Sequence, residues 1–136
     1  MTAPPTDLPT IEFASPMPGF PEHRRFALVR MDEEGFMYEL ASFDDPRLRF
    51  IVVPPTFFFP DYAPEISEET LEALAVDADH LDRVLILLVV TVGRTPGDAT
   101  ANLLAPILID QVSRRAIQVI LTGSDLPVRA ELIPSA

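Results

Sequence analysis

Fifteen prolines among 136 residues constrain the fold of this chain more than any other feature. Proline lacks a backbone N–H and disrupts helix interiors, so each proline limits how far a helix can extend. Only residues 65–95 form a proline-free interval of more than about 25 residues, roughly seven turns of helix. A helical bundle would need at least two such intervals. The sequence therefore excludes an all-helical fold.

Composition restricts the class of protein further. Hydrophobic residues make up 48% of the chain, which indicates an ordered globule rather than a disordered segment. The length suits one domain, which we expect at residues 10–134, after a flexible N-terminal tail at residues 1–9. Cysteine and lysine are absent. Disulfides, cysteine-based zinc sites, Schiff bases and P-loops are therefore excluded.

The N-terminal composition and the apolar runs favour a soluble, intracellular protein. The first twenty residues are acidic and proline-rich and lack the basic and apolar regions of a secretory signal. The longest apolar run, Val84–Val92, has about half the length that a membrane-spanning helix needs.

The segments between the prolines have the patterns of short strands. Residues 25–30 and 36–40 flank an acidic turn that contains Gly35, which predicts a β-hairpin. Residues 84–92 form a continuous run of β-branched residues and leucines, which favours a strand buried on both faces. Further strands are expected at residues 10–13, 48–53, 107–109, 117–121 and 128–132.

One segment has the features of a helix instead. Ser67 precedes two carboxylates, Glu68 and Glu69, as an N-cap residue precedes the first turn of a helix. This pattern predicts a single short helix near residues 67–75. Many short strands and one helix predict an all-β, mainly antiparallel fold, because parallel sheets need repeated crossover helices. We expect a small, partly open β-barrel.

Charge is distributed unevenly along the chain. The formal net charge is −11, and residues 1–82 hold 17 of the 21 acidic side chains but only five of the ten arginines. An acidic surface of this kind either keeps the protein soluble or steers a basic protein partner, and the sequence leaves both interpretations open. Direct binding of nucleic acid is disfavoured, because phosphate contacts come from Lys and Arg.

Candidate catalytic and metal-binding residues are few. The two histidines, His23 and His80, lie far apart in the sequence, although a triad assembled in space is not excluded by sequence alone. Residues 77–82 combine three carboxylates with His80 but lack the length and central glycine of an EF-hand loop. A solvated turn is therefore favoured over a metal site. We expect no enzymatic activity and no cofactor.

The most unusual segment is the aromatic run at residues 57–62. Three consecutive phenylalanines cannot all face one core, since neighbouring side chains of an extended chain point to opposite sides. Either two of them pack inward and one caps a barrel end, or one forms an exposed aromatic anchor beside Asp61.

Four polar residues in the last third of the chain have structural and functional interpretations. Asn102 is either a turn residue that bonds its own backbone or a contact for a partner. Gln118, on an apolar strand, is expected to satisfy a buried backbone group. Arg114 and Arg115 are expected to form a solvated turn.

Two blocks of residues match a specific known pattern. They are Thr-Ala-Asn-Leu-x-Ala-Pro at residues 100–106 and Pro-Asp-Tyr at residues 60–62. Weaker matches lie at residues 8–13, 17–20, 40–50, 107–109, 114–121 and 128–129. Together these segments resemble the flagellar assembly factor FliW family over about residues 8–132. The chain departs from the family pattern at Pro16 (usually glycine), Ala41 (glutamine), Asp110 (asparagine) and Leu126 (often tyrosine).

The resemblance implies a small β-barrel that acts as a protein-binding regulator. FliW proteins bind flagellin in the cytoplasm. They also bind the RNA-binding translational repressor CsrA and so relieve repression of flagellin synthesis. Family members act on CsrA away from its RNA-binding surface, so the acidic half is not expected to mimic RNA. Partner contacts are predicted at Asp44, Asp45, Phe58, Phe59, Pro60, Asp61, Tyr62 and Asn102.

Two alternatives stay open at this point. A small-molecule- or metal-binding β-barrel would have a ligand-lined interior or a bound metal. A chain that had kept flagellin binding alone would tolerate charge reversal at Glu68, Glu69 and Glu72 without any change in binding.

Overall fold

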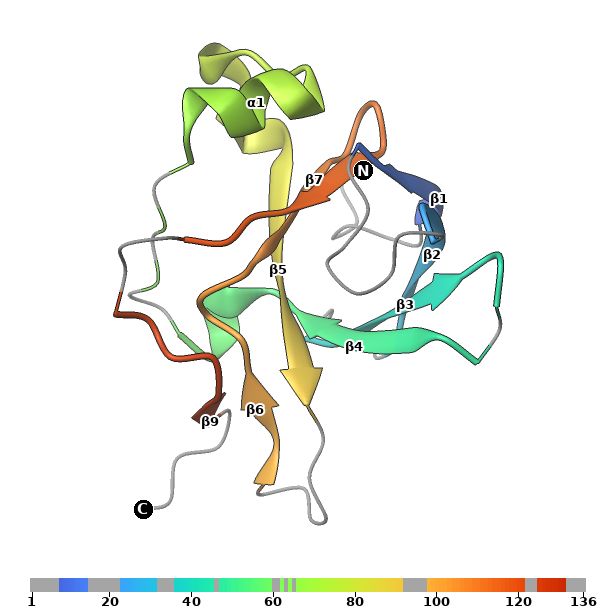
Figure 1. The fold of residues 1–136 in the computed structure, drawn as a ribbon, viewed down its shortest axis with the longest axis vertical. Helices are drawn as coiled ribbons and strands as arrows, with labels where there is room; N and C mark the ends of the chain where they lie inside the picture. Colours follow the sequence, from blue (N-terminus) through green and yellow to red (C-terminus); the bar gives the residue numbers. More distant parts are fainter. Residues whose placement is uncertain are drawn as a thin grey trace.

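The computed structural model is a β-barrel with a short helix packed on its outer side (Figure 1). It describes residues 8–14, 23–31, 36–45, 47–59, 62, 64, 66–91, 98–121 and 125–131. Residues 1–7 of the predicted tail lie outside this part of the chain, and residues 8–9 begin the first strand. None of the helices in the described ranges has the length and apolarity needed to cross a membrane.

The elements follow one another along the chain as short strands, with the helices in the middle. They are β1 (Leu8–Phe13), β2 (Arg25–Arg30), β3 (Tyr38–Ser42), β4 (Arg49–Val53), η1 (Pro55–Phe57), α1 (Glu68–Leu74), η2 (Ala78–Arg83), β5 (Val84–Thr91), β6 (Thr100–Ala101), β7 (Ile107–Asp110), β8 (Arg115–Gln118) and β9 (Ala130–Glu131). Most boundaries differ by only a few residues from those expected from the sequence.

Within the described residues, nine strands form one sheet in the order β4-β3-β2-β1-β8-β7-β5-β6-β9. An additional pairing of β4 with β5 closes the first seven of them into a ring. Neighbouring strands are antiparallel except β1 and β8, which pair in parallel through Glu12 with Arg115 and Phe13 with Ala116. The predicted all-β, mainly antiparallel barrel with one short helix is confirmed, and the β4–β5 pairing makes the ring closed.

The local patterns in the sequence explain several of these strands. The predicted hairpin is confirmed by the antiparallel pairing of β2 and β3, with Leu28 opposite Leu40; Gly35 lies outside the described residues. Strand β5 is buried on both faces, as predicted. Leu87 packs into the barrel interior, whereas Leu88, which points the other way, packs into a cluster on the outer side.

The barrel interior is filled by apolar side chains from the ring. Phe13 and Phe26 meet edge to face there, with ring centroids 5.4 Å apart. The buried members of this interior cluster are Ile11, Phe13, Phe26, Leu28, Tyr38, Leu40, Val52, Leu87, Ile107, Ile109 and Ala116. The side of the ring that faces inward is therefore lined by these apolar side chains, which favours a rigid scaffold over a ligand-lined interior.

Helix α1 covers a second apolar cluster on the outer side of β7 and β8. Its N-cap is Ser67, as predicted, and the Ser67 side chain accepts a hydrogen bond from the Thr70 N–H over 3.2 Å. Leu71 and Leu74 are buried against Leu108, whose strand neighbours point into the barrel. The helix therefore forms because its ends are capped and its apolar stripe has a surface to cover.

The segment at residues 77–82 is an exposed turn that leads from α1 into β5, as favoured from the sequence. It belongs to η2, and the Nδ1 atom of His80 lies 3.8 Å from a carboxylate oxygen of Asp77. Throughout the described ranges, no three His, Asp or Glu side chains come together as metal ligands would.

Candidate protein-binding site

The aromatic segment after β4 lies on the outer side of the barrel. Pro55 begins the short helix η1, and its carbonyl oxygen accepts hydrogen bonds from the N–H groups of Phe58 and Phe59. These two side chains are partly buried and pack against a third apolar cluster, formed by Val53, Leu88, Val90, Ala101 and Leu103. Two phenylalanines thus pack inward as one interpretation predicted, but onto the outer face of the sheet. Pro60 and Asp61 lie outside the described residues.

Tyr62 joins this segment to the chain between β6 and β7. Its hydroxyl donates a hydrogen bond to the Leu103 carbonyl oxygen over 2.7 Å. Burial of the phenol disfavours the phenolate and raises the pKa of Tyr62 to about 12. The contact brings together the two most specific motifs of the sequence, which are about 40 residues apart in the chain.

Asn102 shapes the turn that carries Leu103. Its Oδ1 atom accepts hydrogen bonds from the N–H groups of Leu104 and Ala105 over 3.0 and 3.1 Å. The turn interpretation of Asn102 is confirmed by these bonds, and its role toward a partner stays a prediction. Gln118 donates to the Ala105 carbonyl oxygen over 3.1 Å, so its predicted role toward a backbone group is also confirmed.

Asp44 and Asp45 lie apart from the aromatic segment. Their backbone N–H groups donate to Ser42 Oγ over 3.1 and 3.3 Å in the turn after β3. The side-chain hydrogen bond from Arg47 lowers the pKa of Asp45. This turn adjoins the first residue of β4, whereas the aromatic segment follows its last residue. Strand β4, about 13 Å long, therefore lies between the two groups in the chain.

The pair Arg114 and Arg115 is only partly the solvated turn that the sequence predicts. Arg114 is exposed and has a positive φ of 65° in the turn between β7 and β8. Arg115 is also exposed, but it begins β8 and donates a hydrogen bond to the Ala73 carbonyl oxygen of α1 over 3.2 Å. Arg115 thereby ties the end of the helix to the barrel.

No contact residue was predicted between Gln118 and Arg129, although two described apolar side chains of this segment are exposed. Ile120 and Val128 are each 53% exposed. The available signal was the alternation at residues 119–121, where Val119 is partly buried against the cluster under α1 and Ile120 points outward. An exposed apolar residue in a β-rich chain is by itself weak evidence for a site.

The fold defines a class of protein: a closed β-barrel filled by its own side chains, with further apolar clusters on its outer side. The model of the FliW protein family matches residues 2–132 of the chain. The chain belongs to the FliW family of flagellar assembly factors.

Relatives and a solved structure agree with this assignment. The chain is 40% identical to the flagellar assembly factor FliW of Caldanaerobacter subterraneus subsp. tengcongensis over 125 residues, which cover 90% of this chain and 81% of that protein. It is 37% identical to the FliW of Symbiobacterium thermophilum over 126 residues, or 92% and 90% of the two chains. A crystal structure of the flagellar assembly factor FliW superposes with a TM-score of 0.86 at 32% identity and covers 93% of this chain and 87% of that chain.

Proposed function

We propose that this protein binds flagellin and a CsrA-type RNA-binding repressor in the cytoplasm and thereby relieves repression of flagellin synthesis. The observation that carries the proposal is the family match over nearly the whole chain, residues 2–132. It is supported by the contact between Tyr62 and Leu103, which shows that the two most specific motifs are parts of one structure.

The proposed regulation needs two binding equilibria that are coupled. If flagellin and the repressor exclude one another, each lowers the affinity for the other by the same factor, because coupling between two ligands is reciprocal. Export of flagellin would then leave the protein free to bind the repressor. The work is done by binding, with no bond made or broken.

A competition experiment tests this function. The purified protein is mixed with flagellin and with the CsrA-type repressor of the same bacterium, and complexes are analysed by size-exclusion chromatography with light scattering. We expect a 1:1 complex with flagellin, a complex with the repressor, and displacement of the repressor as flagellin is added. Failure to form a complex with either protein would contradict the proposal.

The predicted contact residues give a second test. Substitution of Asp44 and Asp45 in one variant, and of Asn102 in another, separates the two groups: the aspartates precede β4, whereas Asn102 bonds Val89, which pairs with Val52 near the end of β4. Loss of flagellin binding in one variant only would show which group forms the site.

A further inference from the structure

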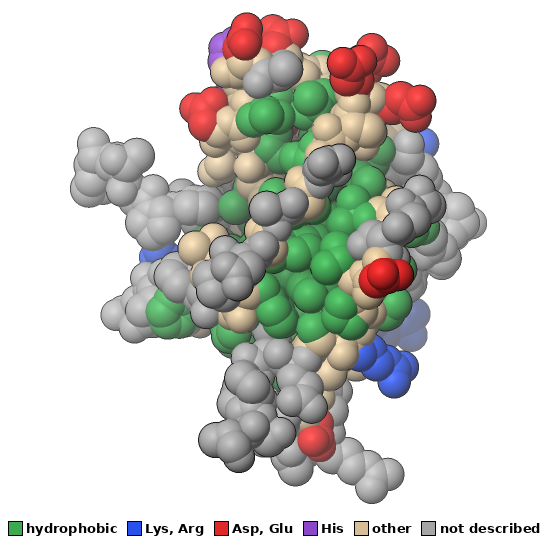
Figure 2. All heavy atoms as spheres, turned by 90° about the vertical axis from the view of Figure 1, so that its left-hand side faces the viewer, with side chains coloured by type: hydrophobic (Ala, Val, Ile, Leu, Met, Phe, Trp, Pro, Cys, Tyr) green, Lys and Arg blue, Asp and Glu red, His purple; other side chains and the backbone are tan. Residues whose placement is uncertain are grey.

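An apolar face covers the side of the barrel that bears the helix and the segment after β8. The described residues of two connections, 62, 64 and 66 in one and 119–121 and 125–128 in the other, lie on this side in Figure 1, and Figure 2 looks directly onto it. Tyr62 and Leu126 pack on the same outer cluster, and Ile66 packs on the cluster under α1. We call five of the described apolar side chains of these connections the outer apolar face: Tyr62, Ile66, Ile120, Leu126 and Val128.

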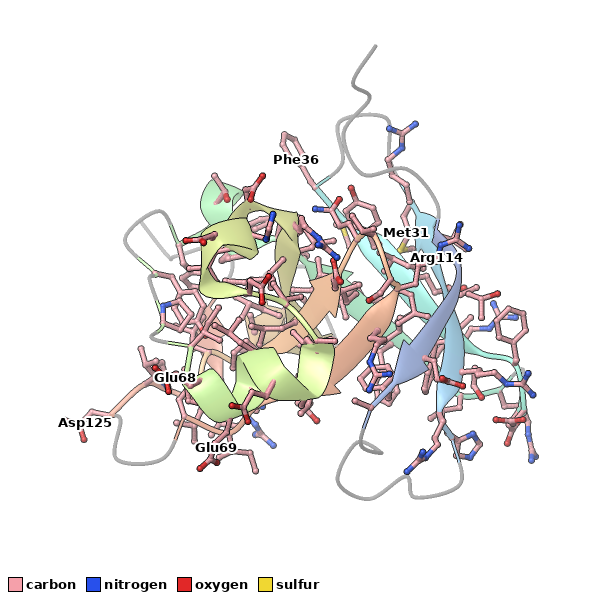
Figure 3. The ribbon with its side chains drawn as sticks, turned by 90° about the horizontal axis from the view of Figure 1, so that it is seen from above. Met31, Phe36, Glu68, Glu69, Arg114 and Asp125 are labelled. Atoms are coloured by element: carbon pink, nitrogen blue, oxygen red, sulfur yellow. The ribbon has the colours of Figure 1, made fainter. Side chains whose placement is uncertain are left out.

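The upper border of the outer apolar face is acidic. Figure 2 shows the hydrophobic area with carboxylates along its upper edge, where α1 lies. Glu68 and Asp125 are exposed and lie on the same side of the molecule in Figure 3, with Glu69 beside them. Neither residues 61–82 nor residues 116–128 contain an arginine or a lysine. A partner that docks here meets hydrocarbon at the centre and negative charge along the upper edge.

We propose that the outer apolar face is the docking surface for the CsrA-type repressor, through a segment with apolar side chains flanked by Lys or Arg. This inference rests on the proposed function, because it names the surface that one of the two proposed partners uses.

Charge complementarity favours this occupant. A protein that binds RNA neutralises phosphates with Lys and Arg and therefore carries positive charge. Its net field is attracted to an acidic border whichever of its own faces finally docks, and this attraction raises the rate of association. The apolar centre, which includes Tyr62, then supplies the contacts that slow dissociation, since a few well-desolvated residues carry most of an interface's binding energy.

The test compares two substitutions in the face with a matched one outside it. Ile120→Asp and Val128→Asp each place a charge on an exposed side chain of the outer apolar face. Val112→Asp is the control, because Val112 is a 68% exposed valine in the turn between β7 and β8. All three side chains are more than half exposed, so the variants are expected to fold, which circular dichroism and urea unfolding check. Affinities for the purified repressor and for purified flagellin are measured by calorimetry.

We expect Ile120→Asp and Val128→Asp to weaken repressor binding by about tenfold or more, and Val112→Asp to leave it within about twofold. A second variant, Glu68→Gln with Asp125→Asn, should slow association with the repressor and reduce its dependence on salt.

Three results would overturn the inference. In the first, the repressor binds all variants as tightly as the wild-type protein, which leaves the proposed function intact but the face unused. In the second, only flagellin binding is lost. In the third, the wild-type protein is a dimer that Ile120→Asp converts to monomers, which would make the face an interface between two copies. If the wild-type protein binds neither partner, the proposed function itself fails.

Discussion

The guanidinium group of Arg83 forms a two-pronged ion pair with the carboxylate of Asp110, with Nη2 2.8 Å from Oδ2 and Nε 3.2 Å from Oδ1. Asp110 has no solvent-exposed surface, although it is the last residue of an otherwise apolar strand. Burial opposes its ionisation, but hydrogen bonds from Ser113 and Arg83 outweigh this effect and lower the pKa of Asp110. The pair links η2 to β7 and so anchors the helical region to the barrel.

Removal of Arg83 from this pair should destabilise the protein. Arg83→Met keeps most of the side-chain volume but leaves a buried carboxylate without its cation, and we expect a loss of about 2–4 kcal/mol in the free energy of unfolding. Urea unfolding measures it. Arg47→Met is the matched control, because Arg47 pairs with Asp45 at the surface and its removal should cause no measurable change. Equal effects of the two substitutions would contradict the prediction.

Tyr62 should make stability depend on pH in alkaline solution. The folded-state pKa of Tyr62 is raised to about 12, whereas an unfolded tyrosine ionises near pH 10. The stability that the neutral phenol of Tyr62 contributes is therefore fully present below about pH 10 and is lost as the pH rises toward 12. Few other side chains titrate in this interval, since the chain has no lysine. Urea unfolding at several pH values should show a smaller alkaline loss in Tyr62→Phe than in the wild-type protein. An equal alkaline loss of stability in the two proteins would contradict this prediction.

Asn102 can be tested for both of its proposed roles with two substitutions. Asn102→Ala removes the acceptor of two backbone hydrogen bonds and should cost about 1–3 kcal/mol of stability. Asn102→Asp keeps the acceptor oxygen but loses the amide donor. We expect it to retain the stability of the wild-type protein and to bind flagellin or the repressor more weakly. Unchanged affinity of Asn102→Asp for both proteins would remove Asn102 from the site.

Replacement of Ala75 by glycine should stabilise the protein. It ends α1 with a positive φ of 59°, a conformation that strains a residue with a β-carbon but not glycine. Ala75→Gly is expected to raise the free energy of unfolding by about 1 kcal/mol. Ala73→Gly, two residues earlier inside the same helix, should lower it by about 1 kcal/mol. Thermal unfolding of both variants measures the effects, and a change of the same sign in both would contradict the argument.

Features determined by neighbouring residues were predictable from the sequence. The Ser67 cap, the β2–β3 hairpin and the burial of β5 on both faces depend on patterns a few residues long, which act through local hydrogen bonds and side-chain alternation. The predicted roles of Asn102 and Gln118 toward the backbone follow from the same kind of reasoning. The family resemblance was readable for a similar reason, because its two specific motifs are contiguous blocks.

Features that join distant residues were not predictable. Nothing in β1 or β8 indicates that these strands, about one hundred residues apart, pair in parallel. The sequence also did not show that Phe58 and Phe59 pack on the outer side of the sheet, or that Asp44 and Asp45 lie at the other end of β4 from them.

The chain's own sequence determined its class: an all-strand barrel with one capped helix, an acidic N-terminal half and the motifs of one family. Only the tertiary structure decided where the barrel closes, which buried charges pair and which apolar side chains form an outer face. The physical reason is that side-chain alternation in strands and capping of helices depend on residues only a few positions apart in the sequence. Ring closure at β4 and β5, and the pairing of Arg83 with Asp110, depend on which distant surfaces meet when the whole chain packs.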